Sequence, residues 1–370
     1  MRTSPLKPTW QAAGAVFAER YGTEVVSSFS DSATECGLVR NSVGLTDFSF
    51  AQIYRIPEEK AVDYLDTFLA GNVARTRFGR MLHTFLPDED GNVAADCYVA
   101  NNDQDFILIC ESVIETGEVD RILDFYGAKE AGVETLTDRC VLLSLDGFDA
   151  WKVVRDVFGR DVLGLPYLSV EVYPFAGESV HLFRAGKTSE FGYLVMAPNS
   201  VADALYEKLH SAVKAAGGGL CGVEAHHALR LEGRFFNIHK EGLKVRDPLV
   251  LGLQWMIDFD KAGGFRGSAP LFGRRAAGLK QKIIGVSAAP RCEALCPGAR
   301  IFHQGRPVAE VATSCDSRVL DRKLGLAVFP VELAYSGLDF TLNAADGPPV
   351  RTISMPPILP KSLGIRLDEM

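Results

Sequence analysis

Apolar residues recur along this chain at two spacings, and the two spacings predict a mixture of helices and strands. Residues 58–69 and 201–216 carry apolar side chains every three or four positions, as one face of a helix requires, whereas residues 52–56 alternate as a strand does. Helices are expected on this basis at residues 9–21, 30–40, 58–69, 149–158, 201–216 and 223–232. Strands are expected at residues 52–56, 81–86, 93–99, 106–110, 141–144, 168–173, 179–183 and 193–196.

The last quarter of the chain changes character. Residues 263–275 contain several glycines and are expected to form a loop-rich junction. After residue 280, short apolar segments are separated by glycine and proline, which predicts strands at residues 282–287, 299–301, 308–313, 323–328 and 340–343. We therefore expect a separate small β barrel or sandwich from about residue 280 onward.

Composition excludes several classes of function. A chain of 370 residues with 47% hydrophobic residues is large enough for two or three domains. Its formal charge of −8 and the lack of a basic stripe argue against nucleic acid as a partner. No apolar run reaches the length of a membrane span, and the N-terminus lacks a signal-peptide pattern. We expect a cytoplasmic protein with no membrane partner.

The eight cysteines do not point to a metal site. They are scattered, form no Cys-x-x-Cys pair and have no matching histidine cluster, so we expect reduced, mostly buried thiols and no metal. His226 and His227 are adjacent on a predicted helix, where neighbouring side chains point about 100° apart and cannot share one ion.

Asp96 is the strongest candidate for chemistry. It lies within an apolar strand, in the segment VAADCYV at residues 93–99. An ionised carboxylate on a core-facing side of such a strand is costly unless it is paired, which favours a functional role. The competing interpretation, an aspartate that faces solvent close to the preceding turn, stays open from the residues alone.

Five ordered segments resemble blocks of the aminomethyltransferase family, which includes the glycine-cleavage T-protein. They are RNSVGLTDFS at residues 40–49, LPDEDGNVAAD at 86–96, FRAGKTSEFGY at 183–193, LRLEG at 229–233 and DPLVLGLQW at 247–255. The resemblance implies an α+β protein with a three-domain, ring-like aminomethyltransferase fold and a C-terminal β barrel. It implies a discontinuous folate-binding-type domain at 1–50 plus 140–275, a ferredoxin-like domain at 51–139 and the barrel domain at 280–370.

The resemblance also implies a function. Members of this family transfer one-carbon groups to tetrahydrofolate in a central hole, and Asp96 matches the aspartate that lies near the accepting nitrogen. A carboxylate can orient such a nitrogen and stabilise a cationic one-carbon donor. By the same alignment, the substrate-binding positions around Asp96 are Phe50, His83, Ala100 and Glu111.

Several positions depart from the family pattern. Leu194 stands where the family has a glutamate that contacts the pterin ring, and leucine cannot accept its paired N–H groups. The remaining candidates for contacts to tetrahydrofolate or to a replacement ligand are Lys187, Glu190, Tyr193, His226 and Arg230. Two of the candidate residues also have a structural interpretation. Arg230 can pair with Glu232 on the helix or lock a domain interface, and His83 can be an ordinary half-buried histidine.

Two hypotheses follow. The first is a folate-dependent one-carbon transferase that acts on a small-molecule methyl or aminomethyl donor, as the folate-dependent demethylases of the family do. The second is a repurposed scaffold that does not use tetrahydrofolate, either as an enzyme of a specialised pathway or as a non-catalytic folate-binding or regulatory protein. The altered ligand positions argue against a lipoyl carrier protein as partner.

Overall fold

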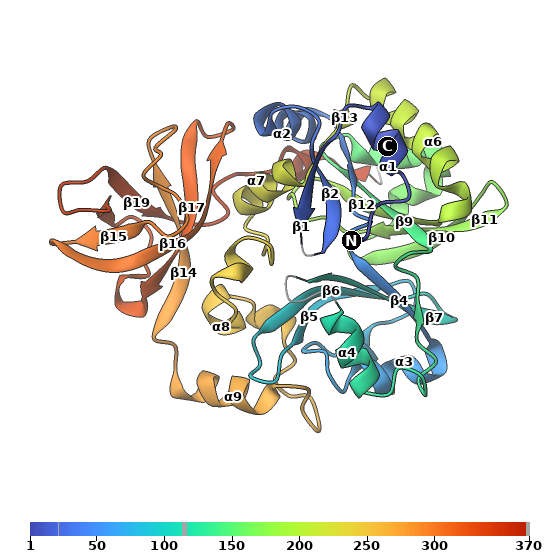
Figure 1. Cartoon of the computed structure of the whole chain (residues 1–370), viewed down its shortest axis with the longest axis horizontal. Helices are drawn as coiled ribbons and strands as arrows, with labels where there is room; N and C mark the ends of the chain where they lie inside the picture. The colour runs from blue at the N-terminus through green and yellow to red at the C-terminus, as the bar shows by residue number, and fades with distance from the viewer. Residues whose placement is uncertain (21, 113–116, 368–370) are drawn as a thin grey trace.

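The chain folds into three β-rich units joined by a largely helical segment. The computed structural model describes residues 1–20, 22–112 and 117–367. Figure 1 shows a mixed unit that contains both termini, a second mixed unit beside it, and a barrel on the opposite side of the connecting helices. This is the α+β arrangement with a closed C-terminal barrel that the sequence predicts.

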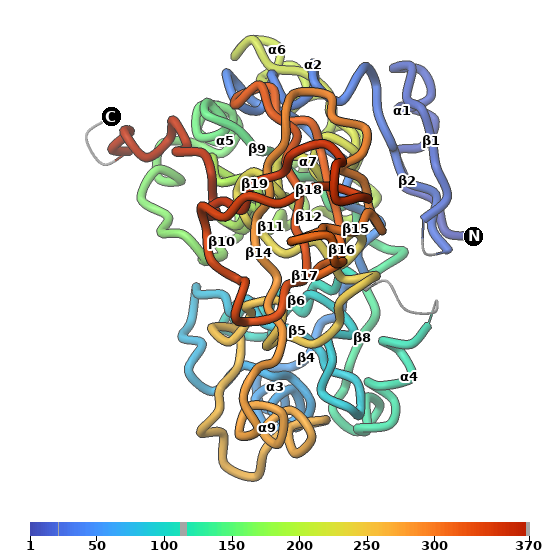
Figure 2. The backbone as a smooth tube through the Cα atoms, turned by 90° about the vertical axis from the view of Figure 1, so that its left-hand side faces the viewer, coloured from blue at the N-terminus to red at the C-terminus, as the bar shows by residue number. Residues whose placement is uncertain are grey.

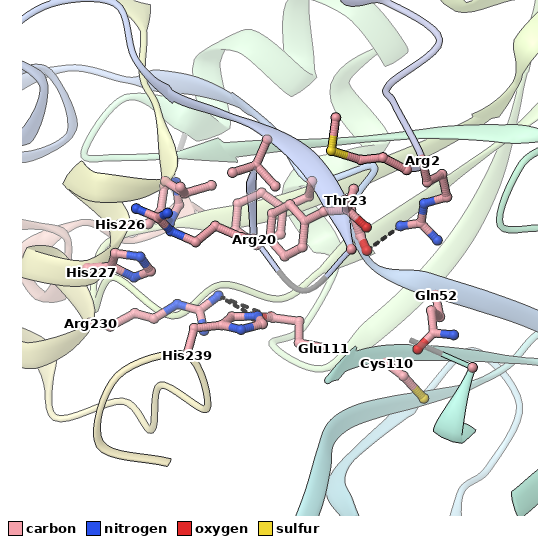
Figure 3. Close-up of a pocket in the computed structure, with 17 residues that line it drawn as sticks. Arg2, Arg20, Thr23, Gln52, Cys110, Glu111, His226, His227, Arg230 and His239 are labelled. Atoms are coloured by element: carbon pink, nitrogen blue, oxygen red, sulfur yellow. Dashed lines mark hydrogen bonds and ion pairs between the residues drawn. The ribbon is translucent and has the colours of Figure 1, made fainter. Parts of the chain in front are cut away.

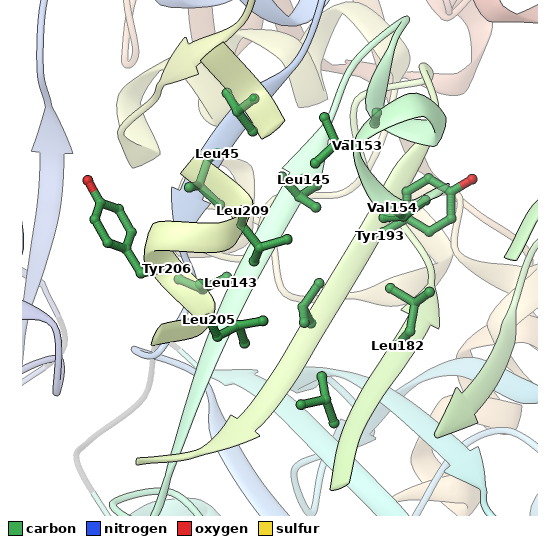
Figure 4. Close-up of a cluster of buried hydrophobic side chains, with 14 of the residues drawn as sticks. Leu45, Leu143, Leu145, Val153, Val154, Leu182, Tyr193, Leu205, Tyr206 and Leu209 are labelled. Carbon is green, nitrogen blue, oxygen red and sulfur yellow. The ribbon is translucent and has the colours of Figure 1, made fainter. Parts of the chain in front are cut away.

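A six-stranded sheet forms the first unit. Its strands in spatial order are β10 (Ser169–Phe175), β11 (Glu178–Arg184), β12 (Gly192–Pro198), β9 (Cys140–Asp146), β3 (Gly44–Asp47) and β13 (Gly219–Leu220). The helices α5 (Ala150–Phe158) and α6 (Ala202–Ala215) cover one face, where apolar side chains such as Leu143, Leu145 and Leu209 build the largest core (Figure 4). Because side chains alternate along a strand, the residues between them point to the opposite face.

A five-stranded antiparallel sheet forms the second unit. Its strands in order are β5 (Met81–Pro87), β6 (Val93–Asn101), β7 (Asp105–Ser112), β4 (Gln52–Pro57) and β8 (Glu134–Thr135). One face packs on α3 (Glu58–Leu65) and α4 (Glu118–Phe125). The other face meets the first unit through a shared apolar cluster that includes Tyr98, Ala100, Phe183 and Leu194. The two sheets therefore stack, and the candidate site lies at this junction.

The third unit is a closed six-stranded barrel. Its strands in order are β14 (Gln281–Ala288), β17 (Arg322–Pro330), β16 (Arg306–Ser317), β15 (Arg300–His303), β18 (Asp339–Leu342) and β19 (Pro349–Ile353). The last described residues leave the barrel and run back to the first unit near α5 (Figure 2). Leu367 packs there in the core of the six-stranded sheet. The barrel strands themselves span residues 281–353.

The connecting segment corrects one expectation. It contains α7 (Val223–Gly233), α8 (Pro248–Leu251) and α9 (Ser268–Ala277). The sequence predicted a loop-rich junction over residues 263–275, but most of that range is α9. This helix buries a single apolar residue, Leu271, so it leaves no periodic apolar signal.

The N-terminus corrects a second expectation. The predicted helix at residues 9–21 is a short helix, α1 (Lys7–Ala12), followed by a hairpin of β1 (Val16–Arg20) and β2 (Thr23–Ser28). Gly14 adopts a φ of +83°, which ends the helix and turns the chain. Among the described residues, no helix is long and apolar enough to cross a membrane.

Candidate functional site

A cavity of about 190 Å³ lies between the β1–β2 hairpin, helix α7 and the edge of the five-stranded sheet. Figure 3 shows its polar side chains converging from these three elements. The residues that line it are Met1, Arg2, Arg20, Gly22, Thr23, Val25, Phe48, Phe50, Gln52, Cys110, Glu111, Gly117, Val223, His226, His227, Arg230 and His239.

Helix α7 contributes two buried polar side chains to the cavity. His226 and Arg230 are four residues apart and therefore lie on one face of the helix. Nη2 of Arg230 donates to both carboxylate oxygens of Glu111, at 3.0 and 2.9 Å. Glu111 lies on β7 of the second unit, so this ion pair joins the connecting segment to the second unit. Arg230 does not pair with Glu232, which instead binds Arg40 and the barrel residue Ser317.

Asp96 lies behind this ion pair and is 1% exposed. One of its oxygens is 2.7 Å from Nε2 of His83, and the other accepts from Nζ of Lys187 at 2.5 Å. The same ammonium donates to Glu111 at 2.9 Å. Asp96, Glu111, Lys187 and Arg230 thus form a buried quartet of two carboxylates and two cations, whose formal charges cancel. We call this set the buried charge quartet.

The quartet fixes the ionisation of its carboxyl groups. Burial alone would raise the pKa of Asp96, but the Lys187 ammonium and His83 outweigh it and hold that pKa below its usual value. Burial opposes ionisation of Glu111 in the same way, yet Arg230 and Lys187 lower its pKa to about 2. Both groups are therefore carboxylates at neutral pH, and Asp96 is a weak base.

The histidines of the cavity are neutral at physiological pH. Burial, together with the nearby Arg230 cation, lowers the pKa of His226 to about 3. Burial also lowers the pKa of His239 to about 3, against the opposing effect of Glu111. Nε2 of His226 lies 3.0 Å from the hydroxyl oxygen of Thr46. A hydroxyl that donates to Nε2 leaves the single imidazole proton on Nδ1.

A second, much smaller cavity of about 20 Å³ adjoins the first and shares Phe48, Glu111, His226 and Arg230 with it. Its wall includes Asp146, which is 1% exposed and accepts hydrogen bonds from the hydroxyls of Ser144 and Thr188. Burial raises the pKa of Asp146 to about 6, because those hydroxyls offset only part of the desolvation. Leu194 and Lys187 line the same cavity.

The structure brings most of the predicted site residues together. The larger cavity is lined by Phe50, Glu111, His226 and Arg230, while Lys187 lines the smaller one and His83 contacts Asp96 from the adjacent strand. Ala100 is fully buried in the apolar cluster between the two sheets. It shares a face of β6 with Asp96 but lines neither cavity.

Two predicted residues lie elsewhere. Tyr193 points into the core on the helix-covered face of the six-stranded sheet, because it precedes Leu194 and strand neighbours face opposite sides (Figure 4). The Glu190 carboxylate accepts the backbone N–H groups of Lys361 and Ser362 in the C-terminal segment. It faces Arg40 and lines a separate surface cavity rather than the two described above.

The wall residues that sequence reasoning missed include Arg2, Phe48, Asp146 and His239. Asp146 ends the apolar run VLLSLD and carried the same signal as Asp96, a lone acid on an apolar strand. Arg2 has no such signal. Its guanidinium donates to the carbonyl groups of residues 49–51, and only the folded hairpin brings them within reach. Among the described residues, no cluster of three histidine, cysteine or acidic side chains could hold a metal ion.

Comparison with known proteins identifies the fold and the family. A solved structure, the glycine cleavage system aminomethyltransferase T from Bartonella henselae, is similar with a TM-score of 0.80 at 22% identity, covering 96% of this chain and 97% of that one. This likeness shows that the chain has the aminomethyltransferase T fold.

Curated relatives cover almost the whole chain. An aminomethyltransferase of Bacillus pumilus is 25% identical over 91% of this chain and 93% of its own length. Another, from Picosynechococcus sp., is 26% identical over 93% and 94%. The GCVT N-terminal domain family matches residues 6–261. Because that match spans more than half of the chain, this protein belongs to the GCVT aminomethyltransferase family.

Proposed function

We propose that this protein is a folate-dependent one-carbon transferase, which moves a methyl or related one-carbon group from a small donor to tetrahydrofolate. Membership of the GCVT family and similarity to aminomethyltransferases over nine-tenths of the chain support the reaction class. The retained Asp96, at the junction of the first two units, supports the location of the chemistry.

The residues present fit the hydrogen-bonding demand of a pterin ring. That ring offers adjacent N–H groups that one carboxylate can accept, and Leu194 cannot accept them. Asp146 lies on β9, where its neighbour Ser144 pairs directly with Leu194 of β12, and all three line the smaller cavity. The carboxylate absent from residue 194 is thus present on the adjacent strand of the same face. This single observation carries the proposal, and Asp146 would hold the pterin.

Asp96 acts as a positioning residue rather than as a proton acceptor. Its lowered pKa keeps it ionised, and both of its oxygens already accept hydrogen bonds. What it does is hold the Lys187 ammonium at the wall of the smaller cavity, beside Asp146. A fixed cation and a fixed carboxylate form a preorganised polar environment for charge that develops during transfer. Tetrahydrofolate, when bound, supplies the nitrogen that accepts the one-carbon unit.

The test is stabilisation of the purified protein by tetrahydrofolate. A ligand at about 100 times its dissociation constant adds about 2.7 kcal/mol to the free energy of unfolding. We expect this gain for the wild type, its loss in Asp146→Asn, and its recovery in the double variant Asp146→Asn with Leu194→Glu. The exposed Asp156→Asn is the matched control and should keep the full gain. If tetrahydrofolate stabilises the Asp146→Asn protein as strongly as the wild type, Asp146 does not hold the pterin.

One observation favours the second candidate function, in which a protein of this fold does not use tetrahydrofolate. Asp96 is 1% exposed and lines neither cavity, so a ligand in these cavities does not contact its carboxylate. On this alternative, tetrahydrofolate stabilises neither the wild type nor any of the three variants. The same titration therefore separates the two candidates.

A further inference from the structure

The guanidinium of Arg230 has donors that the protein leaves unused. Its side chain is 3% exposed, and Nη2 is taken up by Glu111. Nε and Nη1 have no hydrogen-bond partner among the described residues. Buried donors are nearly always paired in folded proteins, and an unpaired cationic donor is especially costly. Since Arg230 lines both cavities, these N–H groups are available to a bound molecule.

His226, one helical turn from Arg230, also has a buried nitrogen without a hydrogen-bond partner among the described residues. It is 3% exposed, and its Nδ1 has no partner within the described part of the chain. Thr46 occupies the other ring nitrogen, which leaves Nδ1 as the free position of a neutral imidazole. Its neighbour His227 differs, because Nδ1 of His227 already meets the amide of Asn237 at 2.7 Å. The unused groups of Arg230 and His226 therefore share one face of α7.

The charge of the larger cavity selects the sign of a ligand. Its described wall contains three arginines, Arg2, Arg20 and Arg230, but only one acid, Glu111. Arg230 and Glu111 both belong to the buried charge quartet, whose formal charges cancel, and Arg20 pairs with Glu224 at 3.5 Å. Arg2, whose guanidinium donates to backbone carbonyl groups, adds a positive charge to this wall, which favours an anion.

The remaining walls favour an anion with an apolar body. The rings of Phe48 and Phe50 lie 5.0 Å apart, centre to centre, and the Phe48 ring lies 5.0 Å from that of His226. Val25 and Val223 extend this apolar surface. Small-molecule sites commonly combine such a surface with a few converging polar groups.

We propose that the larger cavity is a carboxylate-binding subsite, in which Arg230 and His226 donate to the carboxylate of the one-carbon donor and Phe48 and Phe50 contact its apolar body. The donor is thus an organic acid rather than an amine without an acid group or a neutral ether. The claim that this carboxylate belongs to the one-carbon donor rests on the proposed function. The claim that the cavity binds a carboxylate does not depend on it.

Benzoate is the probe, with benzamide as its uncharged counterpart of the same shape. Calorimetric titration of the full chain, without any folate, should show benzoate binding at least about tenfold tighter than benzamide, because hydrogen bonds to charged groups are the stronger ones. Equal affinities for the two compounds would reduce the cavity to an apolar pocket and overturn the proposal.

Two variants test whether Arg230 and His226 contact the benzoate carboxylate. Arg230→Lys keeps a cation for Glu111 but removes the unused N–H groups, and His226→Phe removes Nδ1 while keeping a ring. Each should weaken benzoate binding about tenfold, whereas Arg234→Lys, a neighbouring arginine that lines neither cavity, should change it less than about twofold. If Arg230→Lys does not fold, His226→Phe and the benzamide comparison still decide. Benzoate affinity unchanged in both variants would refute the assignment.

A third probe separates the donor from the other source of carboxylate, the glutamyl tail of folate. The fragment p-aminobenzoylglutamate should compete with benzoate weakly or not at all. If that fragment binds and benzoate does not, the subsite belongs to the folate tail and the donor assignment is wrong. Benzoate binding in a protein that tetrahydrofolate fails to stabilise would remove the proposed function but leave the subsite in place.

Discussion

Replacing Lys187 with methionine is the sharpest perturbation of the buried charge quartet. Methionine fills a similar volume but carries no charge. The ammonium of Lys187 bridges Asp96 at 2.5 Å and Glu111 at 2.9 Å, and its side chain is 5% exposed. After the change, Glu111 keeps Arg230, whereas Asp96 keeps only the neutral His83. The loss is therefore concentrated on one buried carboxylate.

The magnitude follows from the burial of that carboxylate. Removing one partner of a buried ion pair typically costs about 3–5 kcal/mol, since the remaining charge stays desolvated. The residual hydrogen bond from His83 places the expected loss near the lower limit, about 3 kcal/mol of unfolding free energy at neutral pH. A matched surface change, Lys152→Met, breaks an ion pair whose lysine is 41% exposed and should cost less than about 1 kcal/mol.

The stability difference between the wild type and Lys187→Met should depend on pH in a definite direction. In the wild type the pKa of Asp96 is lowered, so its contribution to stability is present above the unfolded value of about 4 and is lost as pH falls below it. In Lys187→Met, burial is no longer outweighed and the pKa rises. The variant then gains relative to the wild type as pH falls and Asp96 takes up a proton. The difference in stability should be largest near pH 7 and should narrow toward about pH 4.

The assay is urea denaturation of the wild type, Lys187→Met and Lys152→Met at several pH values, with unfolding free energies from linear extrapolation. Adding Asp96→Asn to Lys187→Met should restore part of the loss, because the uncompensated charge disappears, and the double-mutant cycle measures that coupling. A Lys187→Met protein that matches Lys152→Met, or whose loss is the same at all pH values, would show that the quartet does not carry this energy.

Two further predictions concern other parts of the molecule. Gly37 lies within helix α2 (Ser32–Asn41), and a Cβ there would meet no atom within 4 Å. Gly37→Ala should therefore raise the unfolding free energy by about 0.5–1 kcal/mol in the same urea assay, and a decrease would contradict the open space at this position. The affinity for benzoate should stay constant between about pH 7 and pH 8, because His226 and His239 have pKa values of about 3 and remain neutral there, while Asp146, with a pKa of about 6, stays ionised. A tenfold fall across that range would indicate that a protonated histidine takes part.

The positions of most strands were predictable from the sequence, because a strand with one buried face alternates and a strand with two buried faces is a continuous apolar run. Strands β6 and β9 were predicted from apolar runs, and the glycine and proline punctuation after residue 280 predicted a small β barrel or sandwich, which the structure shows to be a closed barrel. Elements without periodic burial were not predictable. The helix at residues 268–277 buries only Leu271, and Gly14 turns an apparent helix into a hairpin.

The candidate site likewise contains residues that the sequence reveals and residues that only the folded structure reveals. Asp96 and Asp146 are visible in the sequence as lone acids on apolar strands, although only the first was recognised. Their partners are not visible, because Lys187 reaches Asp96 from a loop 91 positions away and Arg230 reaches Glu111 across 119. Strand alternation explains the placement of Tyr193. The pattern of β12 shows that residues 193 and 194 face opposite sides, but only the packed sheets show which side holds the cavity.

The most direct test of the central claim is a calorimetric titration of the purified wild-type chain with tetrahydrofolate. The account predicts saturable binding with one molecule per chain, and its loss in the Asp146→Asn protein under the same conditions. Absence of binding to a folded wild type that still binds benzoate would contradict folate-dependent transfer, and it would show that this scaffold takes an organic acid without the cofactor of its family.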